Sequence, residues 1–165
     1  MSPFRSSIAV VIGINEYTGR IPSLRTPVAD ATRLADVLEQ QHGYLVVQLT
    51  ENVTLGRLKN LWNDDRLALK PDDRLFFYFA GHGIALNGED GPSGYLVPED
   101  AKLDDPSTFM PMVELYHSLA ALPCKHLLLV LDCCFAGSFR WSCTRTLSAV
   151  QTVVHKERYD RYVRD

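Results

Sequence analysis

The stretch that decides the fold is Leu75-Phe-Phe-Tyr-Phe-Ala-Gly-His-Gly83, an apolar run that ends in a histidine between two glycines. A short, unbroken apolar run is typical of a parallel strand that is covered on both faces. A strand with one solvated face would instead alternate apolar and polar residues. Similar runs cover residues 8–14 and 126–131, and a weaker one covers residues 44–49. We therefore expect four strands in one sheet.

Helical patterns separate these strands. Residues 27–42 begin with a proline, carry apolar residues at helical spacing and stop at Gly43, which predicts an amphipathic helix. A second helix is expected over residues 55–69, with Thr54 as its cap, and a third over about residues 111–122. Strands that alternate with helices predict an α/β fold with a mostly parallel central sheet and helices on both faces.

Size and composition predict a single domain. The chain has 165 residues, of which 46% are hydrophobic, enough for one core and too few for two. Its 17 basic and 20 acidic residues leave a formal charge of -3, which gives no reason to expect a nucleic-acid or anionic-membrane partner. No run approaches the roughly 20 apolar residues that cross a bilayer, and no secretory signal is present. We expect a cytoplasmic protein.

Two kinds of local signal complete the pattern. Residues 87–94 consist almost entirely of turn-forming residues and predict a mobile surface loop. The four cysteines lie within one stretch of 20 residues, whereas a disulfide framework spreads its cysteines along the chain. Free thiols are therefore expected at Cys124, Cys133, Cys134 and Cys143.

Two strand ends carry residues suited to acyl transfer. Active groups gather at the carboxyl ends of parallel strands, where His82 and Cys134 follow two of the apolar runs. A histidine within hydrogen-bond reach lowers the pKa of a thiol and later protonates the leaving amine. Backbone N–H groups at Gly83 and Cys134 are natural donors to the oxyanion of a tetrahedral intermediate.

Simpler roles compete with this interpretation. Alone, His82 is equally well explained as a hydrogen-bonded loop residue, and Cys133 and Cys124 are better explained as small core residues. A redox pair of Cys133 and Cys134 lacks the two-residue spacer of thioredoxin-like motifs, and His82 with one cysteine is an incomplete metal site. An unrelated nucleotide or flavin protein is a further alternative, but no glycine-rich nucleotide motif follows a strand.

Several motifs resemble those of caspases, metacaspases and bacterial orthocaspases. Gly81-His-Gly83, the turn Asp132-x-Cys134-x-x-Gly137 and the order of histidine before cysteine match these peptidases. About 50 residues separate the catalytic pair in caspases, and 52 positions separate His82 from Cys134. The resemblance covers about residues 7–141 and includes three further segments in the metacaspase order: Asn15-Glu-Tyr17, Val28-Ala-Asp-Ala31 and Tyr95-Leu-Val-Pro98.

The resemblance implies a caspase-like three-layer sandwich and a cysteine endopeptidase. Cys134 would be the nucleophile and His82 the general acid and base, with the Gly83 and Cys134 backbone as the oxyanion hole. Where metacaspases usually have His-Ser after the nucleophile, this chain has Phe135-Ala136, which removes a polar side chain and leaves the pair intact. The family suggests a regulated processing enzyme in bacterial defence, stress or cell death. A catalytically silent scaffold module is the alternative, against which the presence of both His82 and Cys134 argues.

Substrate preference follows from the same resemblance. In metacaspases an aspartate of the first helix and the aspartate before the nucleophile bind arginine or lysine, and these map to Asp30 and Asp132. Two carboxylates suit a guanidinium, which carboxylates hold bidentately. We therefore expect a protein or peptide substrate with a basic residue before the cleaved bond. Two other interpretations stay open: Asp30 is a solvated helix-start residue, or Arg25 faces the cleft and favours aspartate.

The resemblance also divides the chain. Residues 1–147 form the expected large-subunit domain, and residues 148–165 form a charged tail. Family members usually continue with a smaller part that adds strands and one wall of the cleft, so a small-subunit portion or a second chain is an expected partner. Tail residues Lys156, Arg158, Arg161 and Arg164 are candidate sites of autoprocessing.

No cofactor is required by this chemistry, although calcium activation is common among metacaspases. Six acidic loop residues could supply oxygen ligands, but they lack the spacing of a calcium loop and are better explained as solvated charges. They are Glu89, Asp90, Glu99, Asp100, Asp104 and Asp105.

Overall fold

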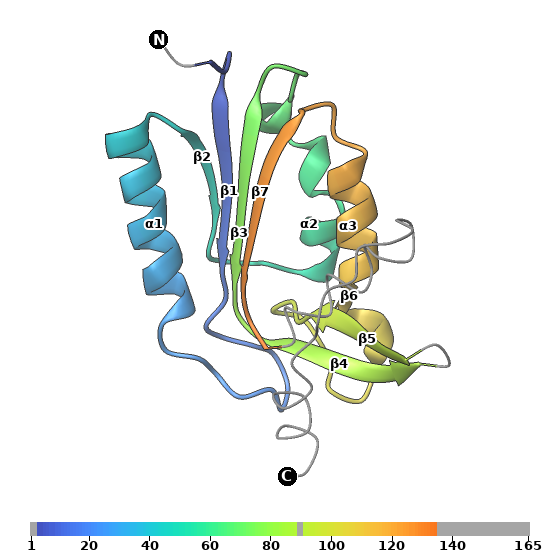
Figure 1. The fold of residues 1–165 in the computed structure, drawn as a ribbon. Helices are drawn as coiled ribbons and strands as arrows, with labels where there is room; N and C mark the ends of the chain where they lie inside the picture. Colours follow the sequence, from blue (N-terminus) through green and yellow to red (C-terminus); the bar gives the residue numbers. More distant parts are fainter. Residues whose placement is uncertain (1–2, 89–90, 135–165) are drawn as a thin grey trace, which may run out of the picture.

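A parallel sheet of four strands organises the molecule. The computed structural model describes residues 3–88 and 91–134, and in these residues the strand order is β2-β1-β3-β7, with every neighbouring pair parallel (Figure 1). The predicted α/β architecture is confirmed, with each strand within one residue of its expected bounds. The strands are β1 (Ser7–Gly13), β2 (Leu45–Leu49), β3 (Arg74–Ala80) and β7 (His126–Asp132).

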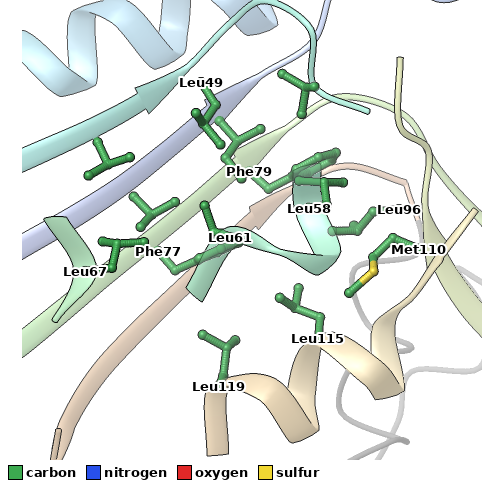
Figure 2. Close-up of a cluster of buried hydrophobic side chains, with 14 of the residues drawn as sticks. Leu49, Leu58, Leu61, Leu67, Phe77, Phe79, Leu96, Met110, Leu115 and Leu119 are labelled. Carbon is green, nitrogen blue, oxygen red and sulfur yellow. The ribbon is translucent and has the colours of Figure 1, made fainter. Parts of the chain in front are cut away.

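Helices cover the two faces of this sheet unequally. On one face, α1 (Pro27–His42) packs small side chains against β1 and β3, and its bounds are those predicted. Gly13 permits this closeness, because a Cβ there would lie 2.5 Å from the Pro27 carbonyl oxygen. The other face carries the larger core, which α2 (Leu55–Lys59) and α3 (Met112–Ala120) cover. Figure 2 shows leucines of these helices packed around Phe77 and Phe79 of β3.

The second predicted helix is wrong in its length. Thr54 does cap α2 by accepting a hydrogen bond from the Arg57 N–H, but α2 ends at Lys59. Two 3-10 turns follow, η1 (Leu61–Asn63) and η2 (Asp65–Leu67). At the end of α2 the Asn60 side chain donates to the Gly56 carbonyl oxygen, and the Asp64 side chain caps η2 by accepting from the Arg66 N–H. Such side-chain hydrogen bonds of Asn and Asp compete locally with a continuous helix.

A small antiparallel sheet lies beside the end of β3. It contains β4 (Gly83–Gly88), β5 (Gly91–Leu96) and β6 (Met110–Pro111), and η3 (Pro106–Thr108) precedes β6. The expectation of a mobile loop over residues 87–94 is therefore wrong, because 87–88 and 91–94 are paired in β4 and β5. The turn-forming residues at 87–88 and 91–94 therefore lie in paired strands, and Glu89 and Asp90 lie outside the described residues.

The strand β7 was predicted to be covered on both faces, and the structure differs from this prediction. β7 is an edge strand of the sheet, and large apolar side chains remain exposed along it among the described residues. Leu128 is 58% exposed and Val130 is 36% exposed, although their register partners on β3 are Phe76 and Tyr78. An apolar run shows that a strand is suited to burial, but it does not show what buries it.

Asp73 ties the amino-terminal segment to the start of β3. Its side chain is fully buried, and its Oδ2 accepts hydrogen bonds from Arg5 at 2.6 Å and from the Lys70 N–H at 2.8 Å. Burial alone would raise the pKa of Asp73, but these hydrogen bonds outweigh burial and hold the pKa below its usual 3.8. Folding therefore favours the charged carboxylate.

Asp73→Asn is expected to lower the free energy of unfolding at neutral pH by about 1 to 2 kcal/mol, because a charge-assisted hydrogen bond loses its charge. Since the folded pKa lies below the unfolded one, this stabilisation is present above about pH 4 and is lost as the pH falls through the folded value. Urea unfolding at several pH values measures it. Asp72→Asn, at an exposed neighbour, is the control. An equal loss for both variants, or a loss that grows at low pH, would contradict the assignment.

Candidate active site

The register of two strands brings the predicted pair together. Each residue of β3 is paired with the residue of β7 that lies 52 positions later, so that Ala80 is opposite Asp132. His82 and Cys134 are separated by the same 52 positions and each lies two residues beyond its strand. The carboxyl ends of β3 and β7 lie side by side (Figure 1), and the two residues follow these neighbouring strand ends. The separation of His82 and Cys134 in the sequence thus equals the offset between paired residues of β3 and β7.

Contacts beyond the strand ends hold the two turns together. The Gly81 N–H donates to the Asp132 carbonyl oxygen at 3.3 Å, which extends the pairing past Ala80. A Cβ added to Gly83 would collide with the Cys134 carbonyl oxygen and lie 3.1 Å from the Cys133 Sγ. Only glycine permits this approach, so Gly83 brings the backbone of the histidine turn against that of the cysteine turn.

The imidazole of His82 is held by the loop that follows β1. Its Nε2 lies 2.8 Å from the Pro22 carbonyl oxygen. A carbonyl oxygen only accepts, so Nε2 carries the proton and the neutral ring keeps its lone pair on Nδ1. The Tyr17 ring lies against the imidazole with centroids 4.9 Å apart, and its hydroxyl accepts a hydrogen bond from the His82 N–H at 2.8 Å. The ring therefore has a fixed tautomer and a fixed place.

The two adjacent cysteines differ in environment. Cys133 is half-buried against the larger core, and burial, followed by the nearby Cys134 and Asp132, raises the pKa of the Cys133 thiol to about 12. A thiol with such a pKa is not a nucleophile at neutral pH. Cys134 is exposed at the strand end. The arrangement leaves Cys134 as the accessible thiol of the pair, and the three described cysteines are free, as expected, while Cys143 lies outside the described residues.

The two carboxylates that were predicted to bind a basic side chain, Asp30 and Asp132, both lie near the Tyr78 hydroxyl. Tyr78, on the α1 face of β3, donates a hydrogen bond to the Asp132 Oδ2 at 3.3 Å. Burial, followed by the negative charges of Asp132 and Asp30, raises the pKa of Tyr78 to about 12. Asp30 from the first turn of α1 and Asp132 from the end of β7 are thus on the same side of the sheet, and both are at least partly exposed. Together they can receive a cation there.

Sequence reasoning misses three groups of this site. The sequence marks Tyr17 only as part of a resembling motif, and it singles out neither the Pro22 carbonyl nor Tyr78. Pro22 contributes a backbone atom, which no residue pattern reveals, and Tyr78 is hidden within an apolar run. Asn15-Glu-Tyr17 does carry a signal, because a tyrosine that follows a strand end borders the active edge of the sheet.

Three of the suggested calcium ligands have other roles. Glu99 accepts from the Val53 N–H, Asp100 from the Leu55 N–H and Asp105 from the Ser107 N–H. Asp104 lies 3.9 Å from the Arg20 guanidinium, and both are exposed. Within residues 3–88 and 91–134, no three His, Cys, Asp or Glu side chains are grouped to hold a metal ion.

Comparison with known proteins shows the family of the chain. The family model of the caspase domain matches residues 6–161. The chain belongs to the caspase family. The fold of this caspase domain is also that of a protein from Geobacter sulfurreducens, GSU0716, whose crystal structure matches with a TM-score of 0.64 and 20% sequence identity. The match covers 86% of this chain and 55% of that protein, so the caspase domain spans about half of its relative's length. No curated protein sequence matches the chain.

The caspase domain contains no helix, among those described, that is long and apolar enough to cross a membrane. The charged tail and its basic residues lie outside the described residues, as do Phe135 and Ala136. The division at residue 147 stays a prediction for the same reason.

Gly83→Ala is expected to lower kcat/KM of the full-length protein for a peptide ending in arginine by about 30-fold, because displacement of catalytic groups by less than 1 Å is costly. The new methyl group would push the Cys134 turn away from the histidine turn. Gly56→Ala is the matched control, because a Cβ there meets only the Thr54 Oγ at 4.0 Å. Initial rates at several substrate concentrations measure the effect. Equal rates for Gly83→Ala and Gly56→Ala would show that the approach of the two turns does not matter.

Proposed function

We propose that this caspase domain is the large-subunit portion of a cysteine endopeptidase that cleaves after arginine or lysine. The observation that carries the proposal is the shared register of β3 and β7, which brings His82 and Cys134 to one edge of the sheet. The contact of the His82 Nε2 with the Pro22 carbonyl oxygen supports it, because it leaves Nδ1 to accept a proton.

The proposed reaction proceeds by acyl transfer. His82 takes the proton of the Cys134 thiol, and the thiolate attacks the carbonyl carbon of the scissile bond. The backbone N–H groups of Gly83 and Cys134 stabilise the oxyanion that forms. His82 then protonates the amine, the carbon–nitrogen bond breaks and an acyl-enzyme remains. Water, deprotonated by His82, hydrolyses the thioester and restores the thiol.

The proposed substrate class rests on Asp30 and Asp132. Both carboxylates lie near the Tyr78 hydroxyl, on the face of the sheet that α1 covers. A guanidinium has five N–H donors in a rigid plane and can engage two carboxylates at once, whereas an aspartate side chain would be repelled. Arginine or lysine before the cleaved bond therefore fits the site, and protein or peptide chains are its substrates. A role as a regulated processing enzyme in bacterial defence, stress or cell death is part of this proposal, as is its autoprocessing in the tail.

The proposal also includes a further polypeptide segment that covers the exposed strand β7. Leu127, Leu128 and Val130 are exposed on β7, and the edge of this strand has no neighbouring strand among the described residues. Such an apolar edge requires cover. A small-subunit portion or a second chain, which family members place next to this strand, would supply the cover and the second wall of the cleft.

The test uses fluorogenic peptides that end in arginine, lysine or aspartate, with the full-length protein, in the presence of calcium and of a chelator. Cleavage after arginine and lysine supports the proposal, and its dependence on calcium decides whether the ion is an activator. Cleavage after aspartate alone would overturn the basic specificity. No cleavage in either condition would favour a silent scaffold module.

A further inference from the structure

Tyr17 makes two contacts with the histidine turn and one with the end of β1, and the proposed mechanism uses none of them. Its hydroxyl accepts the His82 N–H at 2.8 Å and donates to the Ile14 carbonyl oxygen at 3.2 Å. Its ring lies against the imidazole, with the ring planes tilted by 47°. Tyr17 therefore links the end of β1 to His82, two residues beyond β3.

The hydroxyl of Tyr17 can serve both contacts at every physiological pH. Burial raises the pKa of Tyr17 to about 12, the hydrogen bond from His82 lowers it and the nearby Cys133 raises it. The phenol therefore keeps its proton, donates it to Ile14 and still has a lone pair for the His82 N–H.

The hydrogen bond between the Tyr17 hydroxyl and the His82 N–H requires a small residue at position 81. A Cβ at Gly81 would lie 2.9 Å from the Tyr17 hydroxyl oxygen and 3.2 Å from the Phe79 ring. The absence of a side chain at Gly81 thus lets the hydroxyl reach the peptide between Gly81 and His82. That peptide directly precedes the one whose N–H belongs to Gly83, the proposed oxyanion donor.

We propose that Tyr17 is a positioning residue, whose hydroxyl and ring fix the imidazole of His82 and the adjoining Gly83 N–H for attack by Cys134. This inference rests on the proposed function and assigns Tyr17 no contact with substrate. Pro22 and Tyr17 belong to the same loop, so one loop holds the ring of His82 at Nε2 and its backbone at the N–H. A residue with this role affects the rate of the chemical step and leaves substrate binding unchanged.

The test measures kcat and KM of full-length Tyr17→Phe for peptides ending in arginine and in lysine. Loss of one well-formed hydrogen bond predicts a fall in kcat of about tenfold, equal for the two peptides, with KM within about twofold of wild type. Tyr44→Phe is the matched control, because it removes the same atom at the opposite end of the sheet, where Tyr44 packs against Arg74. Thermal unfolding of each variant reports folding separately.

A second readout does not depend on peptidase activity. The rate at which iodoacetamide alkylates Cys134 at pH 6.5, followed by peptide mass spectrometry, reports how well His82 activates the thiol. Tyr17→Phe is expected to slow it toward the rate of His82→Ala. Gly81→Ala, which displaces the hydroxyl and keeps Tyr17, is expected to act in the same way.

The outcomes separate the two proposals. Slower alkylation in Tyr17→Phe and Gly81→Ala without any peptide cleavage in wild type would support the positioning role and overturn the peptidase. Arginine cleavage in wild type, with kcat and alkylation in Tyr17→Phe both within twofold of wild type, would overturn the positioning role alone. A rise in KM without a fall in kcat would also overturn it. Equal alkylation of Cys134 in wild type and His82→Ala would overturn both.

Discussion

Cys134→Ala is expected to lower kcat/KM for arginine peptides by at least about 10⁴-fold, because without the thiol no acyl-enzyme forms and only transition-state binding groups remain. Cys134 is the exposed thiol at the end of β7, in direct backbone contact with the turn that carries His82. Rates of peptide cleavage by the full-length protein, with the folded state checked by thermal unfolding, measure the loss.

Cys133→Ala is the natural control for this change. It removes a thiol one residue away, but that thiol is half-buried against the core and its pKa is raised to about 12 by burial and by Cys134 and Asp132. The variant should lose about 1 kcal/mol of stability and keep its activity within a few-fold. If Cys133→Ala were inactive and Cys134→Ala active, the assignment of the nucleophile would be reversed.

Asp30→Asn and Asp132→Asn are each expected to lower kcat/KM for arginine peptides by about 100- to 1,000-fold, mainly through KM, because one carboxylate partner of a desolvated cation is lost. Asparagine keeps the shape of the side chain and, at position 132, an oxygen that can accept the Tyr78 hydroxyl. A loss of kcat/KM in these variants therefore reports the loss of the negative charge rather than a change of shape. Steady-state kinetics on arginine and lysine peptides measure it.

Asp36→Asn serves as the matched control, since Asp36 is an exposed residue of the same helix α1. It should leave kcat/KM unchanged. If Asp30→Asn behaved like Asp36→Asn, Asp30 would be a solvated residue of the first helical turn, and the interpretation favoured by the helix dipole alone would be correct. Efficient cleavage after aspartate by the wild-type protein would instead favour the interpretation that Arg25 faces the cleft.

The parts of the structure that local patterns determine were predictable from the sequence. The bounds of α1 follow from its proline, its apolar spacing and Gly43, and the four strands of the parallel sheet follow from apolar runs. The antiparallel pairing of β4 and β5 was not predictable from composition, because glycine and asparagine are common both in hairpins and in unpaired loops. The break after α2 coincides with side-chain hydrogen bonds of Asn60 and Asp64, which compete locally with a continuous helix.

The candidate site shows the same division. The positions of His82 and Cys134 beyond two strands were predictable because each follows an apolar run, and the structure adds that their separation equals the register of β3 and β7. Their catalytic roles stay predictions. The supports of His82 were not predictable, because Tyr17 and Pro22 lie in an irregular loop about 60 residues earlier in the chain. What covers β7 was equally hidden, since the apolar side chains of a strand do not identify their partner.

The most direct test of the central claim is covalent labelling of the full-length protein with a peptide chloromethyl ketone that ends in arginine, followed by intact-mass and peptide mass spectrometry. We predict one adduct, a thioether on Cys134, that excess arginine peptide suppresses and that forms far more slowly in His82→Ala. Labelling of Cys133 or Cys124 instead, or equally fast labelling of Cys134 in the His82→Ala variant, would contradict it.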